Sequence, residues 1–475
     1  MCIISIPLVL NDYNLIGELE SYFRLSLTII TNDTYFSKAH EFEKLLKLNN
    51  MTLNSKNPIK ISCSYASFAS LFGIKLYLYQ KDNKKFYSNK DKYDLVGYDY
   101  IDDILGLNNF PLCVPNVILD KDSFNKDINK ILDKDVVKFT PLTLAELYGF
   151  PSFYGKGQTI ALIALGGGYK ANEISYYFKY LKLPTVPRIV NVYIDGATNN
   201  PDNTLNSLEV VMNIEISGAI ANFATLVVYF APNTSRGLYN AIYAAINDTT
   251  YKPNIISVSW GASEKLWPLE TLTTLNNLFA SAVAKGINIF CASGNKGSNN
   301  EDTEPNIIFP ASSPNVIACG GTRVDSGGYN IRNETVWNNF PNNPNTKSAT
   351  GGGISKIFSK LPYQNNVQTN TNMRCVPDLS ANADPKTGYL IFINGGYGIC
   401  GGTSCVSPLM AGLTARLNEA KKQNIGFINN KLYNNNVCAP IKSGNNGAYS
   451  ANSDGSYSLT CGLGRIIAKT ALKKF

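Results

Sequence analysis

The sequence predicts an α/β protein in which helices cover both faces of a parallel sheet, with a smaller α+β domain before it. Residues Gln158–Leu165 form a continuous apolar run, which is typical of a strand buried on both faces. Strand-like and helix-like stretches then alternate as far as Ala292, which is the pattern of a parallel sheet with crossover helices. The length of 475 residues also favours two domains over one.

The elements after residue 158 follow one another in a regular order. We expect further strands at Arg188–Ile194, Thr225–Phe230, Ile255–Trp260 and Ile287–Ala292, and helices at Asn172–Leu181, Leu205–Asn222, Ser235–Asn247 and Glu270–Lys285. Functional residues of such sheets gather beyond the carboxyl ends of the strands, so catalytic or binding side chains are expected in those loops.

Residues 1–119 have a different character and predict a separate domain. Short β-rich runs at Ile3–Leu10 and Ile74–Tyr79 flank a helical stretch at Ser37–Leu48. Residues 120–139 are rich in Asp, Lys and Asn and predict an exposed linker, which leaves residues 140–475 as the larger domain. The apolar start, Met1–Leu10, lacks the features of a signal peptide, so we interpret it as a strand and favour an intracellular or particle-associated location.

Composition argues against several classes of function. No apolar run approaches the roughly 20 residues of a membrane-spanning helix, so no membrane partner is expected. The net charge of +8 is spread along the chain rather than concentrated on a basic face, which argues against nucleic acid. None of the ten cysteines stands in a CxxC pair and there is one histidine, so we expect free buried thiols and no zinc or other cofactor.

Ser404 is the candidate nucleophile. It lies in Gly401-Gly402-Thr403-Ser404, a glycine-rich turn that comes just before an apolar helix beginning near Pro408. A serine at such a turn can expose its hydroxyl beside backbone N–H donors, as a nucleophile requires. The alternative is an ordinary Gly-Thr-Ser helix cap.

A serine nucleophile needs a base, and a carboxylate is the remaining choice. The one histidine, His40, lies in the N-terminal domain, far from the predicted sheet. The helix at Leu205–Asn222 is strongly apolar except for Glu209 and Asn213, which are one turn apart on the same face. Glu209 is therefore a candidate base, with exposure to solvent beside Glu215 as the alternative.

Several longer motifs in this order resemble the sedolisins, the serine-carboxyl peptidases. The runs that carry the resemblance are SVSWG at Ser257–Gly261, FPASSPNVIACGGT at Phe309–Thr322 followed by Trp337, GGGISKIFSKLPYQ at Gly351–Gln364, RCVPDLSA at Arg374–Ala381 and the GGTS motif of Ser404. The resemblance implies a subtilisin-like parallel-sheet catalytic domain preceded by a ferredoxin-like prodomain. It also implies peptide or protein substrates, and a prodomain that acts as intramolecular inhibitor and chaperone until the enzyme cuts its own linker, here between about Asp120 and Thr140.

Carried over position by position, the resemblance makes Ser404 the nucleophile and Glu209 its general base. The family has an aspartate one turn after that glutamate, where this chain has Asn213. The family's oxyanion aspartate corresponds to Asn295. Two aspartates of the family's calcium site correspond to Pro440 and Ser458, so we expect that site to be lost or badly weakened because calcium favours carboxylate ligands.

These departures leave two functions open. The amide of Asn295 is a permanent hydrogen-bond donor and can stabilise an oxyanion without being protonated. Asn213 can hold Glu209 in place but cannot share a proton, and its hydrogen bond should lower the pKa of Glu209. The sequence therefore favours a serine peptidase with a reduced rate and a pH optimum moved towards neutral, with a catalytically impaired binding or structural protein as the alternative. A third interpretation, dinucleotide binding at Gly166-Gly167-Gly168, is disfavoured because the spacing is not GxGxxG.

Overall fold

The computed structural model describes residues 3–4, 13–126, 139–202, 204–300, 302–327, 330–340 and 348–475. The chain forms two compact units. The first unit comprises Met1–Leu112 with residues 233–239 and 265–278, and the second comprises Cys113–Pro232, Asn240–Glu264 and Phe279–Phe475. Within the described residues, every helix is too short or too polar to cross a lipid bilayer.

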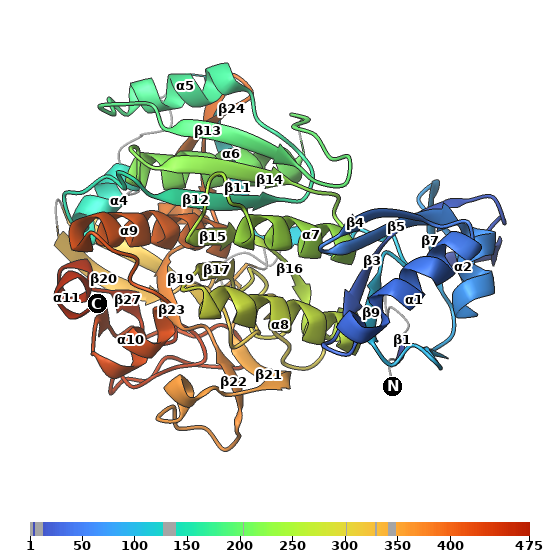
Figure 1. Cartoon of the computed structure of the whole chain (residues 1–475). Coiled ribbons are helices and arrows are strands. Elements are labelled where there is room, and N and C mark those ends of the chain that lie inside the picture. The colour runs from blue at the N-terminus through green and yellow to red at the C-terminus, as the bar shows by residue number, and fades with distance from the viewer. Residues whose placement is uncertain are drawn as a thin grey trace. The chain divides into compact units, whose positions relative to one another are not determined.

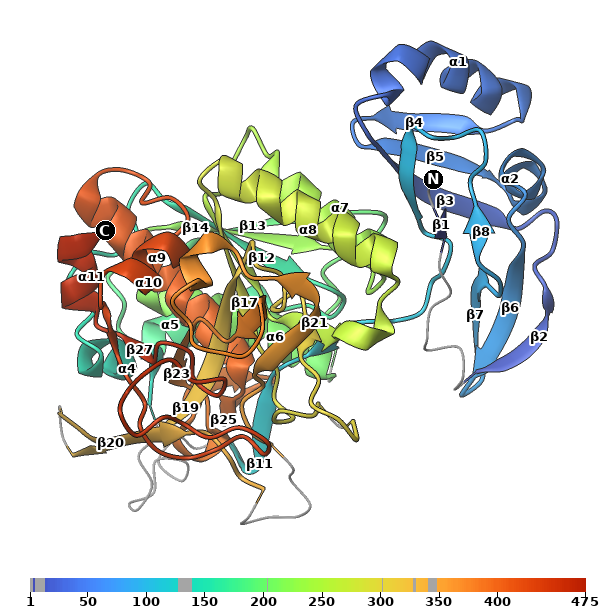
Figure 2. The same cartoon turned by 90° about the horizontal axis from the view of Figure 1, so that it is seen from below.

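The first unit contains the predicted ferredoxin-like arrangement (Figure 2). Its βαββαβ order is formed by β3 (Arg24–Thr31), α1 (Tyr35–Leu48), β4 (Thr52–Lys56), β5 (Ile59–Ser64), α2 (Tyr65–Phe72) and β9 (Ile101–Leu105). The antiparallel sheet has the order β4-β5-β3-β9, which is the ferredoxin-like pairing. Alternate residues Ile59, Ile61 and Cys63 of β5 are buried, as the two-residue period of a strand requires.

The remaining strands of the first unit are β1 (Ile3–Ile4), β2 (Asn14–Glu18), β6 (Leu76–Lys81), β7 (Lys84–Asn89) and β8 (Tyr93–Asp94). Of the strand predicted at Ile3–Leu10, only β1 falls within the described residues. The helix predicted at Ser37–Leu48 is α1, and the strand predicted at Ile74–Tyr79 is β6 shifted by two residues.

The second unit is built on the predicted parallel sheet (Figure 1). Its strands are β13 (Arg188–Tyr193), β14 (Thr225–Phe230), β12 (Thr159–Ala164), β15 (Ile255–Val258), β17 (Asn288–Ala292), β19 (Ile317–Gly327) and β20 (Asn330–Val336) in spatial order, with β23 (Leu379–Asn382) beside β19. All neighbours in this sheet run parallel except β19 and β20. The α/β fold class is therefore confirmed.

The central strands are apolar throughout because both faces of the sheet are covered. In β12, Ile160, Leu162 and Ala164 join the main apolar core of the second unit. The intervening residues Ala161 and Ile163 are also buried, and alternate side chains of a strand point to opposite faces. The continuous apolar run in the sequence therefore reflects burial on both faces.

The described α-helices after residue 140 are α4 (Pro141–Leu147), α5 (Ala171–Tyr180), α6 (Leu205–Ile220), α7 (Ser235–Ile246), α8 (Leu269–Ala284), α9 (Val406–Lys421), α10 (Asn429–Asn434) and α11 (Ala468–Lys474). The helices α5 to α9 form close to where the sequence predicts them, whereas the short helices α4, α10 and α11 were not predicted. Helices α6 and α9 pack against each other and against β12, so the elements that carry Glu209 and follow Ser404 lie side by side (Figure 1).

Smaller sheets surround the amino-terminal end of α9, which begins just after Ser404. Strand β10 (Val114–Pro115) pairs with β16 (Trp260–Ser263), which pairs with β18 (Ile308–Phe309), while β11 (Ile118–Asn125) pairs with β25 (Gly396–Gly401), which pairs with β24 (Tyr389–Ile393). The last elements are β21 (Gly353–Ser359), β22 (Met373–Val376), β26 (Cys438–Ala439), β27 (Arg465–Ile466) and the short 3-10 helices η2 (Glu264–Leu266), η3 (Pro362–Gln364), η4 (Pro385–Thr387) and η5 (Thr403–Cys405).

Two regions of the second unit differ in detail from the prediction. The predicted strand Ile255–Trp260 is divided into β15 and β16, with Ser259 between them. Residues 120–125 of the predicted linker belong to β11, whereas residues 127–138 lie outside the described residues. The domain boundaries at 119 and 139 stay a prediction.

The described cysteines are free thiols, and all except Cys438 are buried, as expected.

Candidate active site

Ser404 lies at the junction between β25 and α9. The chain leaves β25, passes Gly402 with a backbone φ of +104°, and forms η5 before α9 begins. Ser404 is fully buried, and its hydroxyl donates to Glu209 Oε2 at 2.8 Å. The Ser404 hydroxyl also lies 3.2 Å from the carbonyl oxygen of Ser259. A hydrogen bond to a carboxylate prepares a serine hydroxyl to lose its proton.

Helix α6 supplies Glu209 and Asn213 from one face, as predicted from their spacing. Asn213 Nδ2 donates to Glu209 Oε1 at 2.8 Å, so one carboxylate oxygen is held by Asn213 and the other by Ser404. Glu209 is fully buried, and Glu215 is buried as well, so the solvent-exposed alternative for this carboxylate is wrong.

The amide of Asn213 is oriented by two serines of the strand region before β16. Its Oδ1 accepts from Ser259 Oγ at 3.0 Å and from Ser257 Oγ at 3.3 Å. With Oδ1 occupied by donors, the amide nitrogen faces Glu209. The sequence contained a signal for this role, because Ser257 and Ser259 alternate along the SVSWG run and therefore point to one side.

Burial sets the electrostatics of Glu209. Removal of the carboxyl group from water raises its pKa to about 8, although the hydrogen bonds from Ser404 and Asn213 each lower it. The Asn213 hydrogen bond lowers the pKa of Glu209, as expected, but desolvation outweighs it, so the net shift is upward. Glu209 is therefore protonated in acid and ionises near neutral to mildly alkaline pH.

Asn295 lies in the loop after β17, at the carboxyl end of a central strand. Its Oδ1 accepts from the backbone N–H of Thr403 at 2.8 Å, which directs its Nδ2 group away from Thr403. That Nδ2 group donates to the carbonyl oxygen of Asn116 at 2.6 Å. The backbone N–H of Ser404 donates to the same carbonyl oxygen at 3.2 Å. Two donors thus converge on one carbonyl beside the Ser404 hydroxyl, which is the geometry of an oxyanion hole.

The structure brings Ser404, Glu209, Asn213 and Asn295 into one hydrogen-bonded group. Sequence reasoning did not find Asn116, because nothing in the composition of residues 113–125 indicates that they occupy this site. His40 is exposed on α1 in the first unit.

The residues at the family's calcium positions do not fit a calcium ion. Pro440 offers no side-chain oxygen, and the Ser458 hydroxyl is hydrogen-bonded to the Thr460 hydroxyl at 2.9 Å. Among the described residues there is no group of three or more acidic, histidine or cysteine side chains that could hold a metal. We therefore assign no role to calcium, and loss of the family's site stays a prediction.

Comparisons with known proteins agree with this arrangement. The family model described as the subtilase family matches residues 196–437, about half of the chain. Kumamolisin of Bacillus sp. (strain MN-32) is 40% identical over 345 residues, covering 70% of this chain and 62% of kumamolisin. Sedolisin of Pseudomonas sp. (strain 101) is 32% identical over 295 residues, covering 58% of this chain and 49% of that protein.

A solved structure is also similar. Pseudomonas sedolisin complexed with two molecules of pseudo-iodotyrostatin matches with a TM-score of 0.65 and 26% identity, covering 72% of this chain and 98% of that one. The chain spans about half to three fifths of the length of the curated relatives named above. The matched family model, the similar proteins and the shared fold together show that this chain belongs to the subtilase family, in its sedolisin (serine-carboxyl peptidase) branch.

Proposed function

We propose that this chain is a serine peptidase that cleaves peptide bonds through an acyl-enzyme on Ser404. The observation that carries the proposal is the Ser404 Oγ to Glu209 Oε2 hydrogen bond of 2.8 Å beside a peptide carbonyl held by two donors. Membership of the sedolisin family supports peptides or proteins as the substrates.

The reaction follows from the positions of these groups. Ser404 Oγ attacks the carbonyl carbon of the substrate while Glu209 takes the hydroxyl proton. The negative charge that develops on the carbonyl oxygen is stabilised by Asn295 Nδ2 and the Ser404 backbone N–H. Glu209 then protonates the leaving amine as the peptide C–N bond breaks, and water hydrolyses the ester left on Ser404.

The two asparagines determine how the activity differs from that of relatives with aspartates at these positions. Asn295 donates its hydrogen bond at every pH, so the oxyanion site needs no acid to function. Asn213 orients Glu209 but supplies neither a proton nor a charge, which supports a reduced rate. Because the pKa of Glu209 is raised to about 8 by burial, the rate should increase towards neutral and alkaline pH.

The site of the uncut chain is filled by its own residues. The segment Cys113–Asn125 lies across Ser404 and follows directly on residues 1–112 in the chain. An external substrate therefore cannot reach Ser404 while this segment is bound. This supports a prodomain, formed by the preceding residues, that acts as an intramolecular inhibitor.

Incubation of the purified full-length chain from pH 3 to 9 tests the proposal. The intact mass is followed over time, and a labelled unfolded protein reports hydrolysis of an external substrate. We expect the wild type to shorten itself and then to digest the labelled protein, whereas Ser404→Ala does neither. Ser407→Ala is the matched control, because Ser407 is a second buried serine, in the first turn of α9.

A folded wild-type chain that stays intact and leaves the labelled protein uncut at every pH would overturn the proposal. The chain would then be a binding or structural protein. Cleavage that persists in a folded Ser404→Ala variant would equally remove Ser404 from the mechanism.

A further inference from the structure

The segment Cys113–Asn125 is bound across the site as an extended peptide. On its amino side, Val114 and Pro115 of β10 pair with Gly261 and Trp260 of β16. The next residue, Asn116, donates from its backbone N–H to the carbonyl oxygen of Ser259 at 3.2 Å. A peptide bound by strand addition of this kind obtains its register from main-chain hydrogen bonds.

The segment stays extended on the carboxyl side of Asn116. Ile118 and Leu119 of β11 are opposite Gly401 and Cys400 of β25, directly before the glycine turn of Ser404. Figure 2 shows β11 beside β25. The segment is therefore paired with enzyme strands on both sides of Asn116, which is how a peptidase holds a substrate on the two sides of a scissile bond.

The register identifies a single bond. The Asn116 carbonyl oxygen is the atom that accepts from Asn295 Nδ2 and from the Ser404 backbone N–H. A methyl group on Gly402 would collide with this oxygen, so the missing side chain at 402 leaves room for the Asn116 carbonyl. The carbonyl of Asn116 thus occupies the position where an oxyanion would form.

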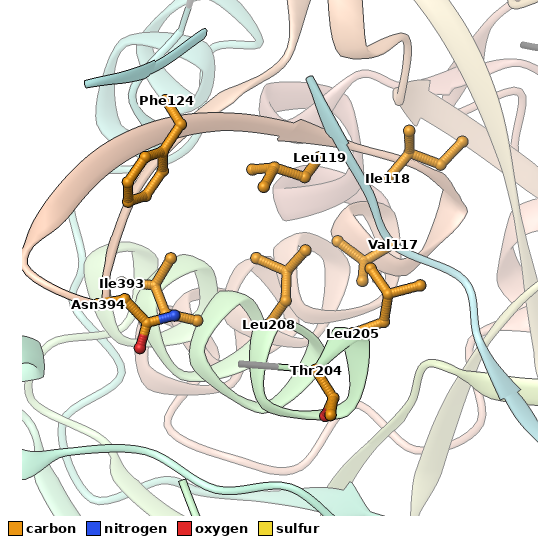
Figure 3. Close-up of a pocket in the computed structure, with 9 residues that line it drawn as sticks. All are labelled: Val117, Ile118, Leu119, Phe124, Thr204, Leu205, Leu208, Ile393 and Asn394. Carbon is orange, nitrogen blue, oxygen red and sulfur yellow. The ribbon is translucent and has the colours of Figure 1, made fainter. Parts of the chain in front are cut away.

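An apolar pocket lies on the side of the segment that follows Asn116 (Figure 3). It has a volume of about 450 Å³. The segment itself contributes Val117, Ile118, Leu119 and Phe124, and the opposing wall consists of Thr204, Leu205, Leu208, Ile393 and Asn394. The wall comes from the first turn of α6 and from the end of β24, elements that also position the site.

Two glycines of β25 extend this surface. A Cβ atom on Gly396 would lie 2.7 Å from the Phe124 ring, and one on Gly398 would lie 3.1 Å from Leu119 Cδ1. Side chains at these two positions would therefore block the space that Phe124 and Leu119 use. We name the apolar surface of Leu205, Leu208, Ile393, Gly396 and Gly398 the leaving-side groove.

From this geometry we propose that the enzyme cuts its own chain between Asn116 and Val117, and that the leaving-side groove selects apolar residues after the cut. The proposal rests on the peptidase function proposed above. Ser404 Oγ forms an ester with the Asn116 carbonyl carbon, and the bond to the Val117 nitrogen breaks. The proton of Ser404 passes through Glu209 to that nitrogen, and water then releases Asn116 as a carboxylate.

The inferred bond lies outside the interval of Asp120–Thr140 that the sequence suggests. The composition of that interval predicts an exposed linker. In the structure, however, Ser123 is buried and donates to the Asp120 carbonyl oxygen at 2.6 Å within β11. Val117 is also buried, with 4% of its surface exposed. Position in the site rather than exposure of the chain therefore determines which bond is cut.

Mass spectrometry of the terminal peptides of the self-processed full-length chain tests the bond. We expect a new amino terminus at Val117 and a new carboxyl terminus at Asn116, both absent from Ser404→Ala. Because the segment and the site belong to one compact unit of one chain, the first-order rate constant should not change with protein concentration. A Ser404-dependent cut at another bond overturns this inference and leaves the peptidase function intact. A folded chain that never cuts itself overturns this inference, and the peptidase function falls with it if the labelled protein also stays uncut.

Substitutions at Val117 test the leaving-side groove. We expect Val117→Asp to slow self-cleavage by at least about 10-fold, since an apolar pocket rejects an ionised side chain, and Val117→Ile to leave the rate within about 3-fold. Lys126→Asp, at an exposed position just beyond β11, controls for the added negative charge.

A variant that keeps the shape of valine separates an effect on cleavage from a folding defect. Val117→Thr keeps the branched outline of valine and replaces one methyl group with a hydroxyl, and thermal unfolding will show that the variant folds. We expect it to cut itself several-fold more slowly than the wild type. If folded Val117→Thr and Val117→Asp cut themselves at the wild-type rate, the leaving-side groove does not select apolar residues. This holds even if Asn116–Val117 is the bond cut.

Discussion

Gly402 controls whether a carbonyl group can reach the two oxyanion donors. A Cβ atom at this position would collide with the Asn116 carbonyl oxygen and lie 2.6 Å from Asn295 Nδ2. The backbone at Gly402 also has a φ of +104°, which glycine adopts without the strain that other residues incur. The lack of space for a Cβ atom and the positive φ therefore both require glycine at position 402.

We predict that Gly402→Ala lowers self-cleavage by at least about 100-fold, since losing an oxyanion contact alone costs that order of rate. Intact-mass kinetics measure the effect. Gly426→Ala is the control for backbone strain, because Gly426 also has a positive φ, of +70°, but has open space around its Cβ position. Similar losses in both variants would show that strain, and not blocked access, is the cause.

The raised pKa of Glu209 predicts the direction of the pH dependence. A general base acts in its ionised form, and burial raises the pKa of Glu209 to about 8 in the segment-bound chain. Self-cleavage should therefore be slow at pH 4 to 5 and accelerate towards about pH 8. Rate constants across pH 4 to 9, with folding checked at each pH, measure this. A sharp maximum near pH 3 to 4 would contradict the prediction.

Helix α6 acts as one element that both buries and orients the base. Every residue from Ser207 to Ile220 is buried, so the polar groups of Glu209 and Asn213 must satisfy each other or their neighbours. Asn213 Nδ2 stabilises the ionised carboxylate, and this hydrogen bond lowers the pKa of Glu209. Asn213 is thus a positioning residue that acts through Glu209.

Replacement of Asn213 by alanine should move the pH–rate profile to higher pH. Without the amide donor, the pKa of Glu209 rises further, so the rate falls most at neutral pH and recovers partly in alkali. The control is Ser217→Ala, which removes a buried hydroxyl from the next turn of α6, where Ser217 donates to the Asn213 carbonyl oxygen. A uniform loss of rate without a shift of the profile would mean that Asn213 has a structural role only.

At the scale of the whole molecule, buried carboxyl groups determine how stability depends on pH. Burial raises the pKa values of Asp103 to about 7 and Glu209 to about 8, and it also raises those of Glu215, Glu264 and Glu334. The folded state therefore holds protons that the unfolded chain releases above about pH 4.5. The stability that these protons provide is lost as the pH rises through the folded-state values.

We predict that the thermal unfolding temperature of Ser404→Ala, which cannot shorten itself, falls between about pH 6 and 9. Glu215→Gln should reduce this fall, because it removes a buried acid whose Oε1 has no hydrogen-bond partner in the described structure. Glu41→Gln, on the exposed side of α1, should leave the fall unchanged. Unfolding temperatures that stay level or rise across this range would contradict the prediction.

The sequence by itself indicated the order of the elements between residues 158 and 292 and suggested the four polar residues of the candidate site. Apolar runs and helical periodicity are local properties, so β12, β14 and α6 could be predicted to within one or two residues. The motifs around Ser404 and Glu209 were recognisable for the same reason. Local patterns did not show where Ile255–Trp260 breaks into two strands, because that break depends on contacts with β10 and β18.

Only the tertiary structure decided what these residues do together. The contact between Ser404 and Glu209 joins residues 195 positions apart, and the contact between Asn116 and Asn295 joins residues 179 apart. Such pairs form when the whole sheet and its helices pack, and no local pattern encodes their geometry. The net pKa of Glu209 and the bond presented to Ser404 were therefore set by packing, since burial around α6 and strand pairing on both sides of Asn116 arise only in the folded chain.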